Sequence, residues 1–464
     1  MAGTAEFVSG WLAGLGCCYR SGMFSRRTDW NLAPNRLAAA LESRRRTGRE
    51  ILDLTISNPT RTGLDYPLNA IAAALADGAR HPYDPQARGD PAAREAVALW
   101  YAGRGLTVDP ARIVLTASTS EAYAWLFKLL CEPGDCVLVP RPSYPLFEFL
   151  AALESVRVAS YPLRYETRWE VDFEAIERHL LEESARCGPG AAVSGTVGPG
   201  PAEPTPFSPD PRRAHAIELP VAAGSKKFLC DAPRAPGTTR AIIAVNPNNP
   251  TGSFLSGAEI EQLCALARER DLPLVCDEVF STYALEPSHR ARSLLETCDA
   301  PAFVLDGLSK SAGMPGIKAG WIVVLGPPVF RDAAIARLEI IADTYLSVGS
   351  PVQKALPRLI ELGAAAGAEI LGRIRANAAA LRSALAGGSA CAALRAEGGW
   401  SAILRLPRTL SEEDWCLRLL GDEGVLVQPG WFYDFESEAY LVVSLLTAEA
   451  EFREGVARIR RCAG

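Results

Sequence analysis

The feature that most constrains the fold is a series of short apolar segments that alternate with helical patterns between residues 113 and 325. Each apolar segment ends in a turn rich in polar residues, glycine or proline. The segments lie at residues 113–117, 136–139, 241–245, 273–276, 303–305 and 321–325. Strands that alternate with helices form mostly parallel sheets wrapped by helices. The sequence therefore predicts an α/β fold with a large domain at residues 81–328.

The remaining chain predicts a smaller α+β domain at residues 329–464. It begins with a long helical pattern through residue 343, followed by helical patterns at 351–363 and 365–385. Strand patterns follow at 400–406, 424–427 and 439–446, and a helix ends the chain. We expect the N-terminal segment, residues 23–80, to join this small domain through a helix at 35–46 and a strand at 51–56.

Two segments do not fit this pattern. Residues 1–22 contain an apolar stretch that is short, broken by glycine and without a basic leader. We therefore expect a loose extension rather than a signal peptide or a membrane span, with Met23 as a candidate start. Residues 182–239 are rich in glycine and proline, and we expect a flexible insertion there.

Charge and cysteine content exclude several classes of partner. The net charge is -6, from 48 Lys+Arg and 54 Asp+Glu, and the sequence contains no long basic run. Both observations argue against nucleic acid as a partner. The 12 cysteines are scattered without a C-x-x-C pair and the four histidines lie far apart, so we expect no metal site. Unpaired cysteines are typical of the cytoplasm. No later segment is long enough to span a membrane.

Lys310 is the most unusual charged residue in the sequence. It follows the apolar segment 303–305 and Ser309, and the apolar segment 321–325 comes soon after. A desolvated lysine favours its neutral amine, which is a nucleophile toward carbonyl groups. The alternative is a lysine at a strand end that extends to water.

Polar residues at the ends of other strands suggest what Lys310 serves. Ser118, Thr119 and Ser120 precede a helix, where backbone N–H groups and the helix dipole favour a phosphate. Ser118 with Glu121 also matches a plain capping box. Tyr144 lies between two prolines, either as a platform for a flat ring or packed on its own domain. Asp277 ends an apolar strand, where a buried acid is costly without a cationic partner. A protonated pyridine nitrogen would be such a partner. The alternatives are that Asp277 caps a helix N-terminus or forms a salt bridge.

These residues together suit pyridoxal 5'-phosphate (PLP), which needs a Schiff-base lysine, a phosphate cradle, a carboxylate and a ring platform. The chain resembles the class I/II aminotransferases of PLP fold type I, in the aspartate aminotransferase superfamily. The most specific matches are the turn 246–252, residues 277–279, and Ser309-Lys310 with Gly316 and Gly320. The resemblance runs from about Thr28 to the C-terminus, except for the insertion.

The resemblance implies a role for each of these residues. Lys310 would form the internal aldimine with PLP and shuttle a proton, and Asp277 would hold the ring nitrogen protonated. Tyr144 would stack on the ring and Asn249 would donate to its O3′. The phosphate would be held by Ser118, Thr119, Ser120, Ser309 and Lys318. Tyr83 would reach the phosphate of a neighbouring subunit, which implies a homodimer with shared sites. Asn58 and Arg61 are candidates for substrate binding.

Three positions depart from the family pattern. Many members carry arginine where this chain has Lys318, and most carry tyrosine where it has Phe280. Near the C-terminus the family places an arginine two positions before a serine, where it grips the substrate α-carboxylate. Here Val442 stands two positions before Ser444, so the usual arginine is missing. Either another cation replaces that arginine, with Arg61 and Arg405 as candidates, or the substrate lacks an ordinary α-carboxylate.

The resemblance implies an aminotransferase that moves an amino group from an amino acid or amine to a 2-oxo acid. The alternative on the same fold is a PLP-dependent lyase or decarboxylase, because small changes in a site redirect this chemistry. A third hypothesis is a non-catalytic regulatory domain. The joint presence of Lys310, Asp277 and Asn249 argues against that third hypothesis.

Overall fold

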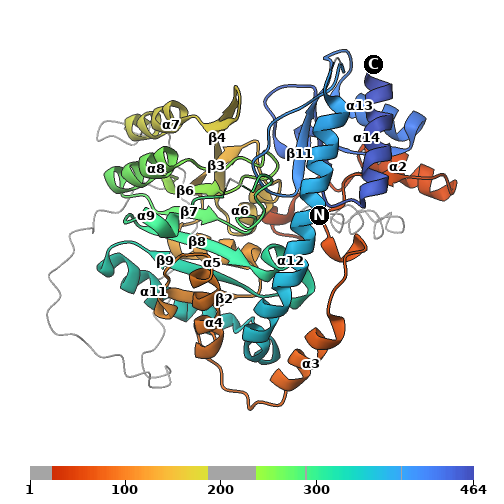
Figure 1. The fold of residues 1–464 in the computed structure, drawn as a ribbon. Coiled ribbons are helices and arrows are strands. Elements are labelled where there is room, and N and C mark those ends of the chain that lie inside the picture. The colour runs from red at the N-terminus through yellow and green to blue at the C-terminus, as the bar shows by residue number, and fades with distance from the viewer. Residues whose placement is uncertain (1–22, 187–236, 288–289, 388) are drawn as a thin grey trace, which may run out of the picture.

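The chain folds around one large, mostly parallel β-sheet, as the sequence predicts (Figure 1). The computed structural model describes residues 23–186, 237–287, 290–387 and 389–464, so the expected extension at 1–22 lies outside it. The strand order is β2-β9-β8-β7-β6-β3-β4-β5. Neighbours from β8 to β4 run parallel, whereas β9 and β5 pair antiparallel with their neighbours. The strands are β2 (Ile113–Thr116), β3 (Cys136–Arg141), β4 (Arg157–Tyr165), β5 (Trp169–Val171), β6 (Thr239–Val245), β7 (Leu274–Asp277), β8 (Ala302–Gly307) and β9 (Gly320–Leu325).

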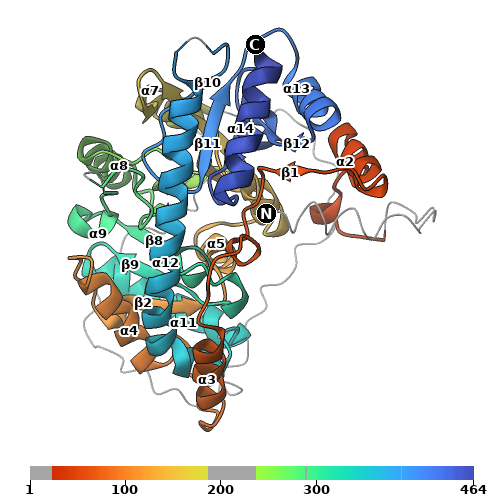
Figure 2. The same cartoon turned by 45° about the vertical axis from the view of Figure 1, so that its right-hand side comes forward.

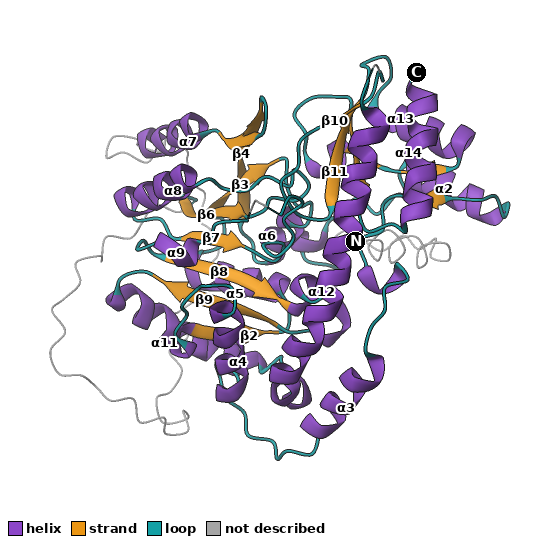
Figure 3. Cartoon of the chain, viewed as in Figure 1, coloured by secondary structure: helices purple, strands orange, loops and turns teal. Residues whose placement is uncertain are grey.

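Helices cover both faces of this sheet (Figure 3). Successive side chains of the central strands enter two separate apolar layers, with Val275 and Phe303 in one and Ile242 and Val304 in the other. A sheet covered on both faces requires apolar residues at every strand position, which explains the continuous apolar runs in the sequence. The helices of this part are α3 (Leu68–Gly78), α4 (Pro91–Ala102), α5 (Thr119–Leu130), α6 (Phe147–Leu153), α7 (Phe173–Arg186), α8 (Gly257–Arg270), α9 (Leu294–Thr297), α10 (Leu308–Ser311) and α11 (Pro328–Tyr345).

The small domain contains a second sheet of order β10-β11-β14-β13. The first part of the N-terminal segment packs on this domain, since β1 (Leu52–Asp53) pairs with β12 (Val425–Leu426) and α2 (Arg36–Arg46) packs on α13, whereas α3 of the same segment packs on the long helix of residues 350–385. The remaining elements are β10 (Ala392–Ala393), β11 (Ser401–Arg405), β13 (Gln428–Pro429), β14 (Tyr440–Ser444), α13 (Glu412–Arg418) and α14 (Glu449–Ala463).

A single long helix, α12 (Ser350–Leu385), connects the two parts of the molecule (Figure 2). The sequence predicts two helices separated near Gly363, but the helix continues through this position. A Cβ atom at Gly363 would lie 2.4 Å from the Cβ of Ala312, so glycine permits the close approach of α12 to the chain after α10. Tertiary packing therefore overrides the low helix propensity of glycine.

Two expected boundaries differ from the packing. The sequence predicts that the helix from residue 329 opens the small domain, but Ala334 and Leu338 of α11 pack in an apolar layer on one face of the large sheet. The expected insertion at 182–239 begins inside α7, which ends at Arg186, and β6 already starts at Thr239. Residues 187–236 lie outside the described part of the chain. None of the described helices combines the length and apolarity that crossing a membrane requires.

Candidate active site

A cavity of about 840 Å³ opens where the carboxyl ends of the parallel strands meet the small domain. Ligands bind at this edge in open α/β sheets. Side chains from both sheets and from the N-terminal segment line the cavity: Thr55, Ser57, Thr119, Ser120, Tyr123, Tyr144, Phe147, Val245, Asn249, Asp277, Val279, Phe280, Lys310, Trp400, Ser401, Gln428, Tyr433 and Ser444.

Asp277 is a buried acid at the end of β7. Its Oδ2 atom accepts a hydrogen bond from the Tyr123 hydroxyl at 3.2 Å, and its Oδ1 atom accepts one from the Val279 N–H at 3.2 Å. Burial raises the pKa of Asp277 to about 6, although these two donors and Lys310 partly oppose the rise. A carboxylate in this position is stabilised further by any cation that enters the cavity.

Lys310 lies in α10, directly after β8. Its Nζ atom is 5.8 Å from the centre of the Phe280 ring and 5.1 Å from that of Trp400. Burial lowers the pKa of Lys310 to about 8, against the opposing charge of Asp277. The Tyr283 hydroxyl donates to the Lys310 carbonyl oxygen at 2.6 Å and fixes the backbone. The amine is thus half neutral near pH 8 and can act as a nucleophile or a base.

The N-terminus of α5 forms another part of the wall. Ser118 is the N-cap, as predicted, and its Oγ atom accepts from the Glu121 N–H at 3.2 Å. In a capping box the Glu121 carboxylate would also accept from the Ser118 N–H. Here it accepts from the Ala117 N–H at 2.6 Å instead. Thr119 and Ser120, in the first turn, line the cavity. Free N–H groups of a first turn and two hydroxyls suit an anion.

Seven of the residues predicted from the sequence meet in this cavity: Thr119, Ser120, Tyr144, Asn249, Asp277, Phe280 and Lys310. Asn249 lies in the turn after β6, and its Oδ1 atom accepts from the Ser401 hydroxyl at 3.3 Å. Tyr144 follows β3, with its ring centre 5.9 Å from that of Phe147.

The other predicted residues lie outside the lining. Ser309 is next to Lys310 in α10, and Lys318 is exposed with a φ of +57°. Asn58 caps the turn Pro59–Arg61, where its Oδ1 atom accepts from the Thr60 N–H, and Arg61 is exposed. Tyr83 is 71% exposed and borders a separate cavity of about 620 Å³.

Sequence reasoning missed several lining residues. Tyr123 follows Thr119 by one helical turn, so helix periodicity from the N-cap offers a signal for it. Trp400, Ser401, Gln428 and Tyr433 come from the small domain. Their position depends on pairing between distant strands, for which local sequence carries no signal.

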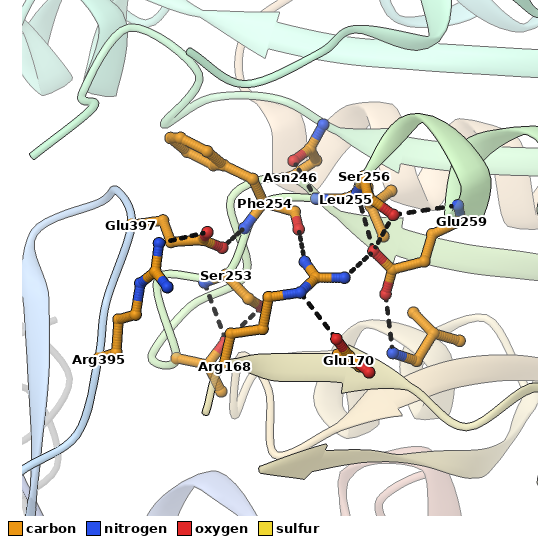
Figure 4. Close-up of polar contacts among 12 residues, drawn as sticks. Arg168, Glu170, Asn246, Ser253, Phe254, Leu255, Ser256, Glu259, Arg395 and Glu397 are labelled. Atoms are coloured by element: carbon orange, nitrogen blue, oxygen red, sulfur yellow. Dashed lines mark hydrogen bonds and ion pairs between the residues drawn. The ribbon is translucent and has the colours of Figure 1, made fainter. Parts of the chain in front are cut away.

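A polar network fixes the loop that carries Asn249 (Figure 4). On one side, Arg168 donates to the Phe254 carbonyl oxygen at 3.4 Å and to the Glu259 carboxylate at 3.0 Å. On the other side, the Phe254 N–H donates to Glu397 of the small domain at 3.1 Å. The loop is therefore held by both domains, and Asn249 reaches the cavity from a rigid support.

Glu259 is the centre of this network. Burial alone would raise its pKa, but the N–H groups of Val171 and Ser256, the Ser256 hydroxyl and the Arg168 guanidinium stabilise the carboxylate. The pKa of Glu259 is consequently below its ordinary value of 4.5. A lowered pKa in the folded state adds stability above about pH 4.5, and this stability is lost as the pH falls through the folded-state value.

We expect Glu259→Gln to lower the free energy of unfolding by about 2 kcal/mol at pH 7, since an amide nitrogen cannot accept these bonds. The deficit should shrink as the pH falls from about 4.5 through the lowered folded-state pKa of Glu259, where the wild-type carboxyl becomes protonated. Urea unfolding at several pH values measures both effects. Glu261→Gln, at an exposed position of the same helix, is the matched control. Equal losses in the two variants would contradict the assignment.

Known proteins resemble this chain along most of its length. The family model described as "Aminotransferase class I and II" matches residues 49–459. A glutamate-pyruvate aminotransferase AlaA of Escherichia coli is 24% identical over 310 residues, which cover 67% of this chain and 63% of that protein. The chain thus spans less than two thirds of that relative. The 4-dedimethylamino-4-oxo-anhydrotetracycline transaminase OxyQ of Streptomyces rimosus is 26% identical over 418 residues, 88% of this chain and 93% of that protein.

Solved structures share the fold. An alanine aminotransferase from Pyrococcus furiosus superposes with a TM-score of 0.74 at 19% identity, covering 95% of this chain and 99% of that one. A Thermus thermophilus aspartate aminotransferase mutant gives a TM-score of 0.72 at 22% identity, covering 94% and 99%. Since the family model spans most of the residues, and Lys310 and Asp277 share one cavity, this chain belongs to the class I and II aminotransferase family.

Proposed function

We propose that the protein is a PLP-dependent aminotransferase that moves an amino group from an amino acid or amine to a 2-oxo acid. The observation that carries this proposal is the meeting of Lys310 and Asp277 in one buried cavity, where burial lowers the pKa of the amine and raises that of the acid. Perturbed acid and base pairs of this kind mark catalytic sites.

The residues in the cavity fit PLP. When bound, this cofactor supplies an aldehyde that accepts an amine and a ring that withdraws electrons. Asp277 would face the protonated ring nitrogen and Tyr144 the ring plane. Asn249 keeps its amide N–H groups for the ring oxygen, because Ser401 already donates to its carbonyl side. Thr119 and Ser120 would hold the phosphate, assisted by Ser118, Ser309 and Lys318.

The chain's own groups perform the proton transfers. The Lys310 amine would take a proton from the α-carbon of the donor and return one to the carbon of the acceptor. Asp277 would keep the neighbouring ring nitrogen charged throughout. Phe280 and Trp400, whose ring centres are 5.2 Å apart, would exclude water from the Lys310 amine.

The names of the relatives support amino transfer over a lyase or decarboxylase reaction. The Streptomyces relative is named for a 4-oxo compound rather than a 2-oxo acid, which supports a broader range of acceptors. We also propose a homodimer in which the exposed Tyr83 reaches the neighbouring site. The described cysteines are free thiols, which supports a cytoplasmic location.

The lowered pKa of Lys310 leads to a pH prediction. The protein freed of cofactor should capture PLP with a rate that rises around pH 8, since only the neutral amine reacts. A free lysine would show a midpoint near about 10.4. Asp277→Asn should shift the midpoint further down, because the Asp277 charge favours protonated Lys310. Stopped-flow absorbance measures the rate, and a midpoint above about 10 would exclude a desolvated amine.

A donor screen tests the proposed function. Purified protein with bound PLP should lose its visible absorbance when a suitable amino donor is added and regain it when a 2-oxo acid follows. Loss and return in that order are specific to amino transfer, whereas a decarboxylase releases carbon dioxide and keeps the cofactor unchanged. A coloured protein that no amine or amino acid converts would refute the proposal.

A further inference from the structure

The substrate side of the cavity is formed by the small sheet. Strand β14 contributes Ser444, strand β13 contributes Gln428, and Trp400 precedes β11. Two residues before Ser444 is Val442, which is only 1% exposed and is paired with Gln428 across the sheet. Directly paired residues of antiparallel strands project from the same face, so the Gln428 side chain lies beside position 442.

The lining carries almost no positive charge. Among the described residues that border the cavity, Lys310 is the one cation and Asp277 the one carboxylate. The two arginines considered from the sequence, Arg61 and Arg405, are exposed and lie outside the lining. A carboxylate that enters this cavity would lose its water without gaining a guanidinium partner, which is unfavourable.

Gln428 instead offers neutral hydrogen bonds. The hydroxyl of Tyr433, a residue that is 4% exposed, donates to the Gln428 Oε1 atom. This bond orients the amide and leaves its Nε2 hydrogens as donors toward the cavity. The Ser444 hydroxyl is already committed to the Ile56 carbonyl oxygen. An oriented amide in the cavity that the Trp400 and Phe280 rings also line suits a carbonyl, amide or hydroxyl group on a largely apolar skeleton.

We infer that this site prefers amines and ketones whose reacting carbon bears an uncharged group, and that Gln428 determines this specificity. The inference rests on the proposed amino transfer and narrows its substrate class, since a 2-oxo acid then becomes a poorer acceptor than an uncharged ketone. In the overall exchange the donor amine becomes a ketone and the acceptor ketone becomes an amine. The nitrogen and two electrons pass from one to the other, so no external oxidant is required.

The test compares donors that differ only at the α-carboxylate. Alanine, phenylalanine and tyrosine are each paired with their α-amides, and the rate of loss of cofactor absorbance is measured under single-turnover conditions. We expect the amide to react about tenfold or more faster per unit concentration in each pair that reacts. Equal rates, or faster acids, would overturn the inference while leaving amino transfer intact. Conversion of neither member of any pair, by a protein that binds PLP, would overturn amino transfer itself and the inference with it.

Two variants locate the preference at Gln428. Gln428→Arg should shift the acid-to-amide rate ratio toward the acid by about tenfold or more, since it supplies a bidentate partner for a carboxylate. Gln428→Leu should slow the amides without accelerating the acids. Cofactor absorbance and the thermal midpoint verify that each variant is folded. An unchanged ratio in a folded Gln428→Arg protein would show that Gln428 does not set specificity.

Discussion

Replacing Lys310 with alanine is expected to lower the rate of amino transfer by about 10⁴-fold or more. The variant loses both the amine that attaches the cofactor and the base that moves the proton at the substrate carbon. No other lysine or histidine lines the cavity in the described chain, so no neighbouring base replaces it. Single-turnover absorbance changes with a reactive donor measure the loss.

A small amine should partly rescue this variant. Methylamine at high concentration fits the space vacated by the side chain and supplies a base of similar type. Lys128→Ala is the matched control, since Lys128 lies on the outer side of α5 in an ion pair with Glu154. Surface pairs of this kind contribute little to stability. If the Lys310→Ala variant reacted at the wild-type rate, Lys310 would have no role in the mechanism.

Replacing Asp277 with asparagine is expected to lower the same rate by about 100-fold or more, because the negative charge that faces the ring nitrogen is lost. The shape is retained, and the asparagine oxygen can still accept from the Val279 N–H, whereas the Tyr123 hydroxyl must accept from the new amide nitrogen instead of donating to an oxygen. The effect therefore reports charge rather than packing. The variant should also bind PLP more weakly, which equilibrium dialysis measures.

The adjacent buried acid provides the control. Glu278 lies outside the cavity lining, and its carboxylate accepts from the Ser293 hydroxyl at 2.6 Å and the Leu294 N–H at 2.9 Å. Burial raises the pKa of Glu278 to about 7, so the folded protein tolerates a neutral side chain there. Glu278→Gln should retain near wild-type rates. Similar losses of rate in Asp277→Asn and Glu278→Gln would mean that any substitution in this region disturbs the structure, and that the Asp277 charge has no specific role.

The large sheet could be predicted because its central strands are buried on both faces and appear as continuous apolar runs. Lys310, Asp277 and Tyr144 drew attention for the same reason, since each lies at or soon after the end of such a run, whereas Asn249 was chosen within its turn from the resemblance to the family. The four residues line one cavity. Local sequence thus carries most of the information about the cofactor side.

The substrate side could not be predicted. Gln428 reaches the cavity only because β13 pairs with β14, and Tyr433 orients it only after that pairing has formed. The continuity of α12 past Gly363 likewise depends on contact with Ala312, a residue from a different part of the chain. Such long-range contacts leave no periodic trace in the sequence.

The covalent capture of PLP by Lys310 is the central claim and can be measured directly. The purified wild-type protein is supplied with PLP, reduced with borohydride and digested, and the peptides are analysed by mass spectrometry. We predict a pyridoxyl-phosphate adduct on Lys310 and none in Lys310→Ala. A wild-type protein that stays colourless with PLP and carries no adduct on Lys310 would contradict the account.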